Sequence, residues 1–83
     1  MASGRPFDMR KRTAAHKKLP LGTIVLLENQ ANDKWVVARI EDRGPYYKSR
    51  TLDVSLALAR ELDFEREGLA WILVTPLIYP EKN

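Results

Sequence analysis

The titratable side chain with the most informative neighbours is Asp42, in the stretch Glu41-Asp-Arg-Gly-Pro45. Glycine supplies unusual backbone angles and proline fixes φ, so we expect a sharp turn just after this carboxylate. A carboxyl group on a stiff corner beside Glu41 holds its proton more tightly through like charge and partial desolvation, as an acid working near neutral pH must, while Arg43 opposes this effect. The alternative is a turn-forming aspartate that accepts hydrogen bonds from nearby backbone groups.

Two other side chains could move or hold a proton. His16 ends the stretch Thr13-Ala-Ala-His16 and precedes two lysines, so it is either an ordinary surface residue or a donor that holds a substrate hydroxyl or tunes Asp42. Asp53 lies in Leu52-Asp-Val-Ser55, where either Ser55 or Asp53 could cap the following helix, and such a cap would explain Asp53 fully. Both residues stay open between a structural and a functional role.

The composition is that of one small globular domain. A chain of 83 residues suffices for one domain, and 45% hydrophobic with 30% charged residues argues against intrinsic disorder. Lys and Arg outnumber Asp and Glu by 14 to 11. Such a charge could meet nucleic acid, an anionic membrane or an acidic wall polymer, although a solvated surface is the simpler interpretation. The excess lies near the start, at Arg5, Arg10, Lys11, Arg12, Lys17 and Lys18.

Several classes of site and segment are not expected. The sequence has no cysteine and a single histidine, so neither a disulfide, a metal site nor a bound cofactor is predicted. No apolar run approaches the roughly 20 residues that span a bilayer, and the first residues have no signal-peptide core. We therefore expect no membrane contact by this domain itself.

The hydrophobic pattern predicts a mainly β domain of residues 1–83. Residues 1–20 predict an irregular lead-in with one turn of helix near 13–16, residues 55–62 predict a helix, and residues 78–83 a tail. In the second expected strand Val36, Ala38 and Ile40 share the face that suits the core. The strands are expected at residues 22–28, 34–40, 50–54 and 69–75, with a hairpin turn at residues 29–33. Pro76 ends the last strand or places it at a sheet edge.

Four short segments, read together in this order and at this spacing, resemble the rare lipoprotein A family. The resemblance covers residue 2 to about residue 77. It implies a small six-stranded double-psi β-barrel with one or two short helices, incomplete here because family domains begin with one more strand. The segments are Ala2-Ser-Gly-Arg-Pro-Phe-Asp-Met9, Thr13-Ala-Ala-His-Lys-Lys-Leu-Pro-Leu-Gly-Thr23, Ile40-Glu-Asp-Arg-Gly-Pro-Tyr46 and Leu52-Asp-Val-Ser55.

The resemblance also implies an activity. Active members are lytic transglycosylases, which cleave the bond between N-acetylmuramic acid and N-acetylglucosamine in peptidoglycan glycan strands. The sugar's own 6-hydroxyl, and not water, closes onto the anomeric carbon, so one carboxyl group can serve as acid and then as base. By motif position Asp42 is the acid/base, with His16 nearby and Asp53 lining the groove. The expected substrate-binding residues are Thr13, Arg43, Tyr46 and Arg5, with Trp35, Tyr47 and Trp71 as further rings for sugar stacking, although core or rim packing suits Trp71 better.

Two departures from the family pattern matter. Arg5 stands where the family has a glutamate thought to take part in catalysis, and an arginine cannot act as an acid or base at physiological pH. This change either leaves Asp42 working alone or marks a domain that binds glycan without cutting it. The missing first strand would leave an unpaired sheet edge, which a second copy of the chain could cover in a homodimer.

Three functions are thus open. The leading one is a peptidoglycan-cleaving domain whose parent works in the periplasm or cell envelope of a bacterium. The second is a non-catalytic module that binds cell-wall glycan. A nucleic-acid-binding barrel is the weakest, because the basic cluster contains only Phe7 while the tyrosines and tryptophans lie elsewhere. No nucleic-acid partner is therefore expected.

Overall fold

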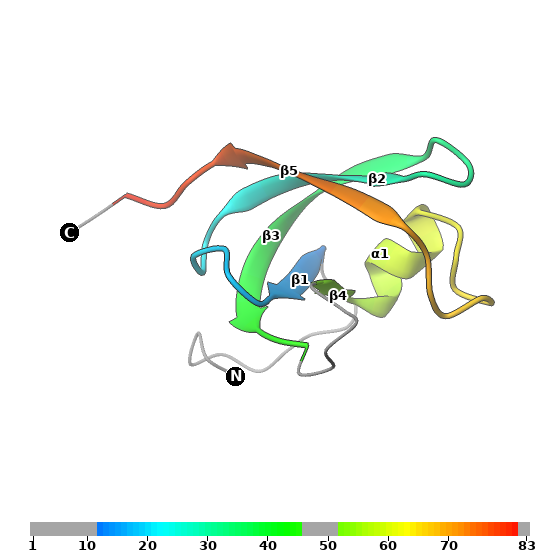
Figure 1. The fold of residues 1–83 in the computed structure, drawn as a ribbon, viewed down its shortest axis with the longest axis horizontal. Coiled ribbons are helices and arrows are strands. Elements are labelled where there is room, and N and C mark those ends of the chain that lie inside the picture. Colours follow the sequence, from blue (N-terminus) through cyan, green and yellow to red (C-terminus); the bar gives the residue numbers. More distant parts are fainter. Residues whose placement is uncertain (1–11, 46–51, 82–83) are drawn as a thin grey trace.

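The structure, a computed structural model, describes residues 12–45 and 52–81. These residues form one sheet of five strands in the order β4-β1-β3-β2-β5, together with one short helix (Figure 1). β1 is parallel to β3, and the other neighbouring strands are antiparallel. The elements are β1 (Thr13–His16), β2 (Ile24–Asn29), β3 (Trp35–Arg43), β4 (Leu52–Val54), α1 (Leu56–Glu61) and β5 (Ile72–Ile78). The mainly β prediction is confirmed, with five strands in the described residues and the sheet curled as in an incomplete barrel.

The hairpin of β2 and β3 follows directly from the sequence. Apolar and β-branched residues fill β2, and turn-forming residues separate it from β3. Asp33 adopts a φ of 60°, and buried Asn29 accepts the Ala31 N–H at 3.0 Å while donating to the Leu62 carbonyl at 2.8 Å. The predicted turn is confirmed, and Asn29 also ties it to the end of the helix.

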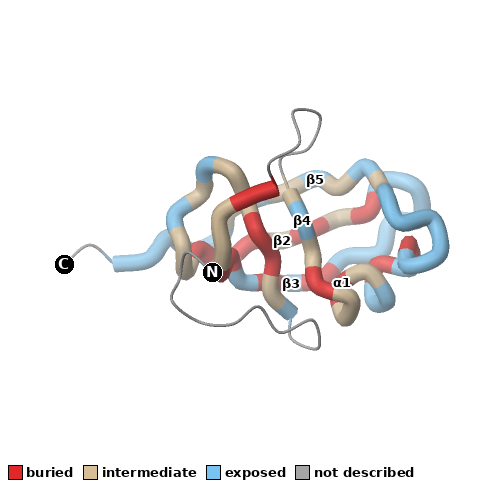
Figure 2. The backbone as a smooth tube through the Cα atoms, turned by 90° about the horizontal axis from the view of Figure 1, so that it is seen from below, coloured by how far each residue is buried: buried red, intermediate tan, exposed pale blue. Residues whose placement is uncertain are grey.

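The core lies inside the curl of the sheet, where α1 packs (Figure 1). Val36, Ala38 and Ile40 are buried, whereas Trp35 and Val37 on the other face of β3 are 64% and 41% exposed. This is the face that the alternation predicted. Figure 2 shows the buried positions gathered on the inner strands and the helix, with β5 exposed or intermediate. The core cluster is completed by Ala14, Val25, Leu27, Leu58, Leu62 and Phe64.

Residues 13–16 form strand β1, so the expected turn of helix in an irregular lead-in is wrong there. Ala14 is fully buried and Ala15 is only 8% exposed, because β1 lies between β3 and β4. Alanine favours helix in isolation, but pairing with a strand more than twenty residues away decides the outcome. The residues around β1 do not indicate that β3 is its partner.

The corner expected at Asp42 lies further along the chain. β3 continues to Arg43, so Asp42 belongs to the last residues of the strand. The turn comes at Gly44, whose φ of 140° is a conformation that side-chain-bearing residues rarely adopt. Glycine therefore has the backbone role predicted for it, and Asp42 owes its position to strand pairing.

Strand β5 runs three residues beyond its expected end and passes through Pro76. The Gln30 N–H donates to the Trp71 carbonyl at 3.0 Å, so by alternation residues 72, 74 and 76 direct their backbone groups to the free edge. Pro76 therefore costs no hydrogen bond to β2, as the alternative edge assignment predicted. The expected packing of Trp71 is wrong, because its side chain is 87% exposed.

Candidate functional site

The sheet order brings three of the sequence motifs together. β1 carries Thr13–His16 and lies between the end of β3 and the short strand β4. Ala15 is in register with Asp42 on β3 and with Asp53 on β4. Residues in register share one face of a sheet, so the two carboxylates flank Ala15, with Cα atoms about 10 Å apart as two strand spacings require. The structure therefore places Asp42 and Asp53 on the same face of the sheet.

A register shift in the β1–β3 pair sets the side on which Asp42 lies. Ala14 pairs with Ile40 and Ala15 pairs with Asp42, so Glu41 is an extra residue in β3. In a regular strand Asp42 would share the face of Ile40, which is fully buried. The extra residue instead turns Asp42 to the face of Ala15.

Glu41 itself is held on the same side as the preceding basic residue. Its carboxylate pairs with Arg39 at 3.1 Å, and its side chain is only 11% exposed. The like charge that the sequence placed beside Asp42 is therefore paired with a cation.

The Asp42 carboxylate has a local backbone partner. Its Oδ1 accepts the Arg43 N–H at 2.8 Å, and the residue is partly buried. This bond is the one that the turn-forming alternative predicted, and it also fixes the direction of the carboxylate. Asp53 is exposed, and the helix cap that would have explained it is supplied by another residue.

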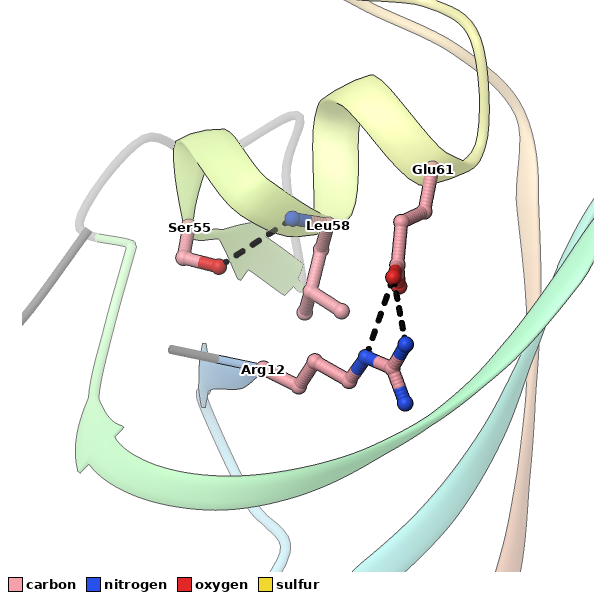
Figure 3. Close-up of polar contacts among 4 residues, drawn as sticks. All are labelled: Arg12, Ser55, Leu58 and Glu61. Atoms are coloured by element: carbon pink, nitrogen blue, oxygen red, sulfur yellow. Dashed lines mark hydrogen bonds and ion pairs between the residues drawn. The ribbon is translucent and has the colours of Figure 1, made fainter. Parts of the chain in front are cut away.

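That residue is Ser55, whose Oγ accepts the Leu58 N–H at 3.3 Å at the start of α1 (Figure 3). The same view shows Arg12 and Glu61, which join the chain before β1 to the last turn of the helix. Arg12 Nε and Nη2 both donate to Glu61 Oε1, at 3.1 and 2.5 Å. Sequence reasoning offered Ser55 as a cap but missed this ion pair, because 49 residues separate its members.

His16 does not share the face of the two aspartates. It is in register with Arg43 and Leu52, one position beyond Ala15, and successive strand residues point to opposite faces. Its Nδ1 accepts the N–H groups of Lys18 and Leu19, each at 3.0 Å. Burial, followed by the charges of Arg43 and Lys18, lowers the pKa of His16 below its ordinary 6.5. The ring is therefore neutral at pH 7.

Acid is expected to destabilise the fold through this histidine. His16 of the unfolded chain takes up a proton near its ordinary pKa, whereas the pKa of folded His16 is lower, so falling pH favours the unfolded state. The contribution to stability is complete above the unfolded pKa and is lost as the pH falls through the folded one. Urea unfolding at about pH 7.5 and about pH 5.5 should show a smaller loss for His16→Asn than for the unmodified protein. Equal losses would assign the acid sensitivity to other groups.

Arg43 contacts the backbone. Its Nη1 donates to the carbonyls of His16 at 3.0 Å and Leu19 at 2.6 Å. The guanidinium thus holds the turn after β1 against the end of β3. Its expected role in binding substrate stays a prediction, as do those of Arg5 and Tyr46, which lie outside the described residues.

Thr13 presents no hydroxyl to solvent. Its Oγ1 is the one buried side-chain polar atom without a hydrogen-bond partner in the described ranges. Its backbone carbonyl accepts the Ser55 N–H at 3.1 Å, so the residue contributes to pairing through its main chain. A direct contact between this hydroxyl and a substrate stays a prediction.

Removing the Thr13 hydroxyl is expected to be harmless. Thr13→Val should leave the free energy of unfolding unchanged or raise it by up to about 1 kcal/mol, because an unpaired buried hydroxyl costs about 1–3 kcal/mol. The matched control is Thr23→Val, since the fully buried Thr23 donates to the Pro20 carbonyl at 2.6 Å. That change should cost about 1 kcal/mol. Thermal unfolding of both variants decides, and equal losses would show that Thr13 has a partner in solution.

The part of the chain that the structure describes holds neither a metal-binding cluster nor a membrane-spanning helix. No group of three or more His, Cys, Asp or Glu side chains in residues 12–45 and 52–81 could hold a metal ion. Within the same ranges, no helix has the length and apolar character needed to cross a bilayer.

Comparison with known proteins gives a consistent family. The family model described as "Lytic transglycolase" matches residues 1–74. A Treponema pallidum protein named probable endolytic peptidoglycan transglycosylase RlpA is 51% identical over 73 residues, which is 88% of this chain and 23% of that protein. Proteins named endolytic peptidoglycan transglycosylase RlpA are 39% identical in Neisseria meningitidis serogroup A and 42% in Pseudomonas aeruginosa, over 93% and 88% of this chain. The chain spans 32% and 21% of these two relatives.

Proposed function

The chain belongs to the rare lipoprotein A-like family of double-psi β-barrel lytic transglycolases, and on this premise we propose that it cleaves peptidoglycan glycan strands. Support comes from relatives at 39–51% identity whose names state this activity. The observation that carries the proposal is the register that puts Asp42 and Asp53 on one face, either side of Ala15.

In the proposed reaction Asp42 is the acid and then the base. Its carboxyl group protonates the oxygen that bridges N-acetylmuramic acid to N-acetylglucosamine, and the bond from the anomeric carbon to that oxygen breaks. The resulting carboxylate takes the proton of the muramic 6-hydroxyl while that oxygen bonds to the anomeric carbon, which leaves a 1,6-anhydro end. The proton balance closes on one residue, so a second proton-transferring group is not needed. Asp53 contributes negative charge near the developing positive charge of the sugar.

The alternative is a module that binds the same glycan without cutting it. The arginine at position 5, where the family resemblance implies a glutamate, favours this alternative. Digestion of purified sacculi separates the two functions: the cleavage proposal requires soluble products with 1,6-anhydro-muramic ends by mass spectrometry. Protein that sediments with intact sacculi and releases nothing would support binding alone. In either case the partner is the glycan strand, and we place the parent protein in the bacterial periplasm or envelope.

We also propose that two copies of the chain pair through β5. This strand is one edge of the sheet, and by the alternation of its pairing the backbone groups of Ile72 and Val74 point away from its partner β2. Leu73 and Ile78 add apolar side chains that are 52% and 64% exposed. Light scattering over a range of concentrations tests the pairing, and a monomer throughout would overturn it.

A further inference from the structure

His16 and Arg43 together form a hydrogen-bonded unit at the end of β1. The Nδ1 lone pair of His16 is occupied by the N–H groups of Lys18 and Leu19. A nitrogen that accepts two N–H groups carries no proton, so the proton of the neutral ring lies on Nε2. The imidazole therefore caps the turn that follows its own strand.

The same turn is held from β3 by Arg43. Its Nη1 contacts the carbonyls of the first and last residues of the turn, His16 and Leu19. The ring and the guanidinium thus bind complementary groups of one four-residue segment, the ring its N–H groups and the guanidinium its carbonyls. Loss of the His16 ring or of the Arg43 guanidinium would leave the turn held by only one of the two side chains.

This unit reaches Asp42 through the main chain. Arg43 follows Asp42 directly, and its N–H donates to Asp42 Oδ1 at 2.8 Å. Because the Arg43 side chain is tied to the turn, the direction of its N–H is tied as well. The path from the imidazole to the carboxylate consists of hydrogen bonds between neighbouring groups and needs no movement of charge.

The surroundings of His16 oppose a proton-transfer role. Positive groups face it from two sides, Arg43 on β3 and Lys18 in the turn, while its neighbour in register on β4 is the apolar Leu52. Asp42 and Asp53 are in register with Ala15, so their carboxylates lie on the face of the sheet opposite to His16. A protonated imidazole would lose its two N–H contacts and face two cations.

We propose that His16 and Arg43 are positioning residues, which hold the Asp42 carboxylate in the direction it needs, and that His16 neither gives nor takes a proton in the reaction. The cap itself is a property of the free protein. The positioning of Asp42 for glycan cleavage rests on the proposed function.

Matched substitutions of His16 test the role of each ring nitrogen. Asparagine places an acceptor near the position of Nδ1, whereas glutamine places its amide near Nε2. We expect His16→Asn to keep most of the wall-cleaving activity with an unchanged pH profile, and His16→Gln to lose about 10- to 100-fold, as a misplaced catalytic group does. Equal loss in both variants, or an altered pH profile in His16→Asn, would make His16 a catalytic group.

A second measurement needs no activity. In nitrogen-15 NMR of the free protein, His16 should show a protonated Nε2 and an unprotonated Nδ1 at neutral pH. The Arg43 amide proton should follow the titration of Asp42 in the unmodified protein and in His16→Asn, and lose this response in His16→Gln. A protonated Nδ1 would overturn the cap, and an Arg43 amide indifferent to Asp42 would overturn the positioning. Failure to cleave sacculi with both NMR results intact would count against the proposed function alone.

Arg43 has its own pair of variants. Arg43→Gln removes the positive charge beside His16, so the pKa of His16 should rise toward its ordinary value, whereas Arg43→Lys keeps the charge and should leave it low. Arg39→Gln is the control, because Arg39 pairs with Glu41 and is not among the causes of the lowered pKa of His16. An unchanged His16 titration in Arg43→Gln would separate the two residues and contradict the unit.

Discussion

Replacing Asp42 by asparagine is expected to lower the rate of glycan cleavage by at least about 100-fold, because general acid–base catalysis contributes about 100- to 10,000-fold. The amide oxygen of asparagine can still accept the Arg43 N–H, so the direction of the side chain is kept while its proton transfer is lost. The measurement is the release of anhydro-muramic products from sacculi, with enzyme amounts matched after the fold is checked by circular dichroism.

The control for this change is Asp63→Asn. Asp63 is exposed, and its φ of 57° lies in the region that asparagine tolerates well, so the same chemical change should leave both fold and activity intact. Asp53→Asn provides the comparison within the site, and its loss should be smaller because this residue acts by charge alone. Unchanged activity in Asp42→Asn would remove Asp42 from the mechanism.

The largest effect on stability is expected from Leu58→Ala, with a loss of about 2–5 kcal/mol in the free energy of unfolding. Leu58 is fully buried and packs the helix into the core cluster. A domain of this size has a total stability of only about 5–15 kcal/mol, so the melting temperature of the variant should fall by at least about 8 °C. Thermal unfolding followed by circular dichroism measures the shift.

Leu73→Ala is the matched control for the core substitution. Leu73 is 52% exposed on the outer face of β5, so the same truncation there should cost less than about 1 kcal/mol. A loss as large as that of Leu58→Ala would mean that the outer face of β5 is covered in solution, which would itself support the pairing of two chains.

Sequence reasoning succeeded where the information is local. The turn at residues 29–33, the buried face of Val36, Ala38 and Ile40, and the Ser55 cap each depend on residues within a few positions of one another. The motifs that suggested the family also named Asp42 and Asp53, which the sheet brings to one face.

It failed where the decisive partner is distant. No residue near Ala14 or Ala15 indicates the parallel partner on β3, so the local sequence predicts a turn of helix there. The capping of the 16–19 turn by His16 and the backbone contacts of Arg43 depend on geometry that residue types do not encode. The sequence suggested chemical roles for His16 and Arg43 because their side chains are ionisable, whereas in the structure both bind backbone groups.

The extra residue in β3 makes the site sensitive to chain length as well as to composition. One residue inserted in β1 between Ala14 and Ala15 would give Glu41 a partner, restore the regular alternation of β3 and carry the Asp42 carboxylate to the apolar face of Ile40. Substitution of Glu41 keeps the count and would alter only an ion pair with Arg39. A version of this segment transferred to another protein therefore has to keep the number of residues in both paired strands, because that number decides the face on which Asp42 lies.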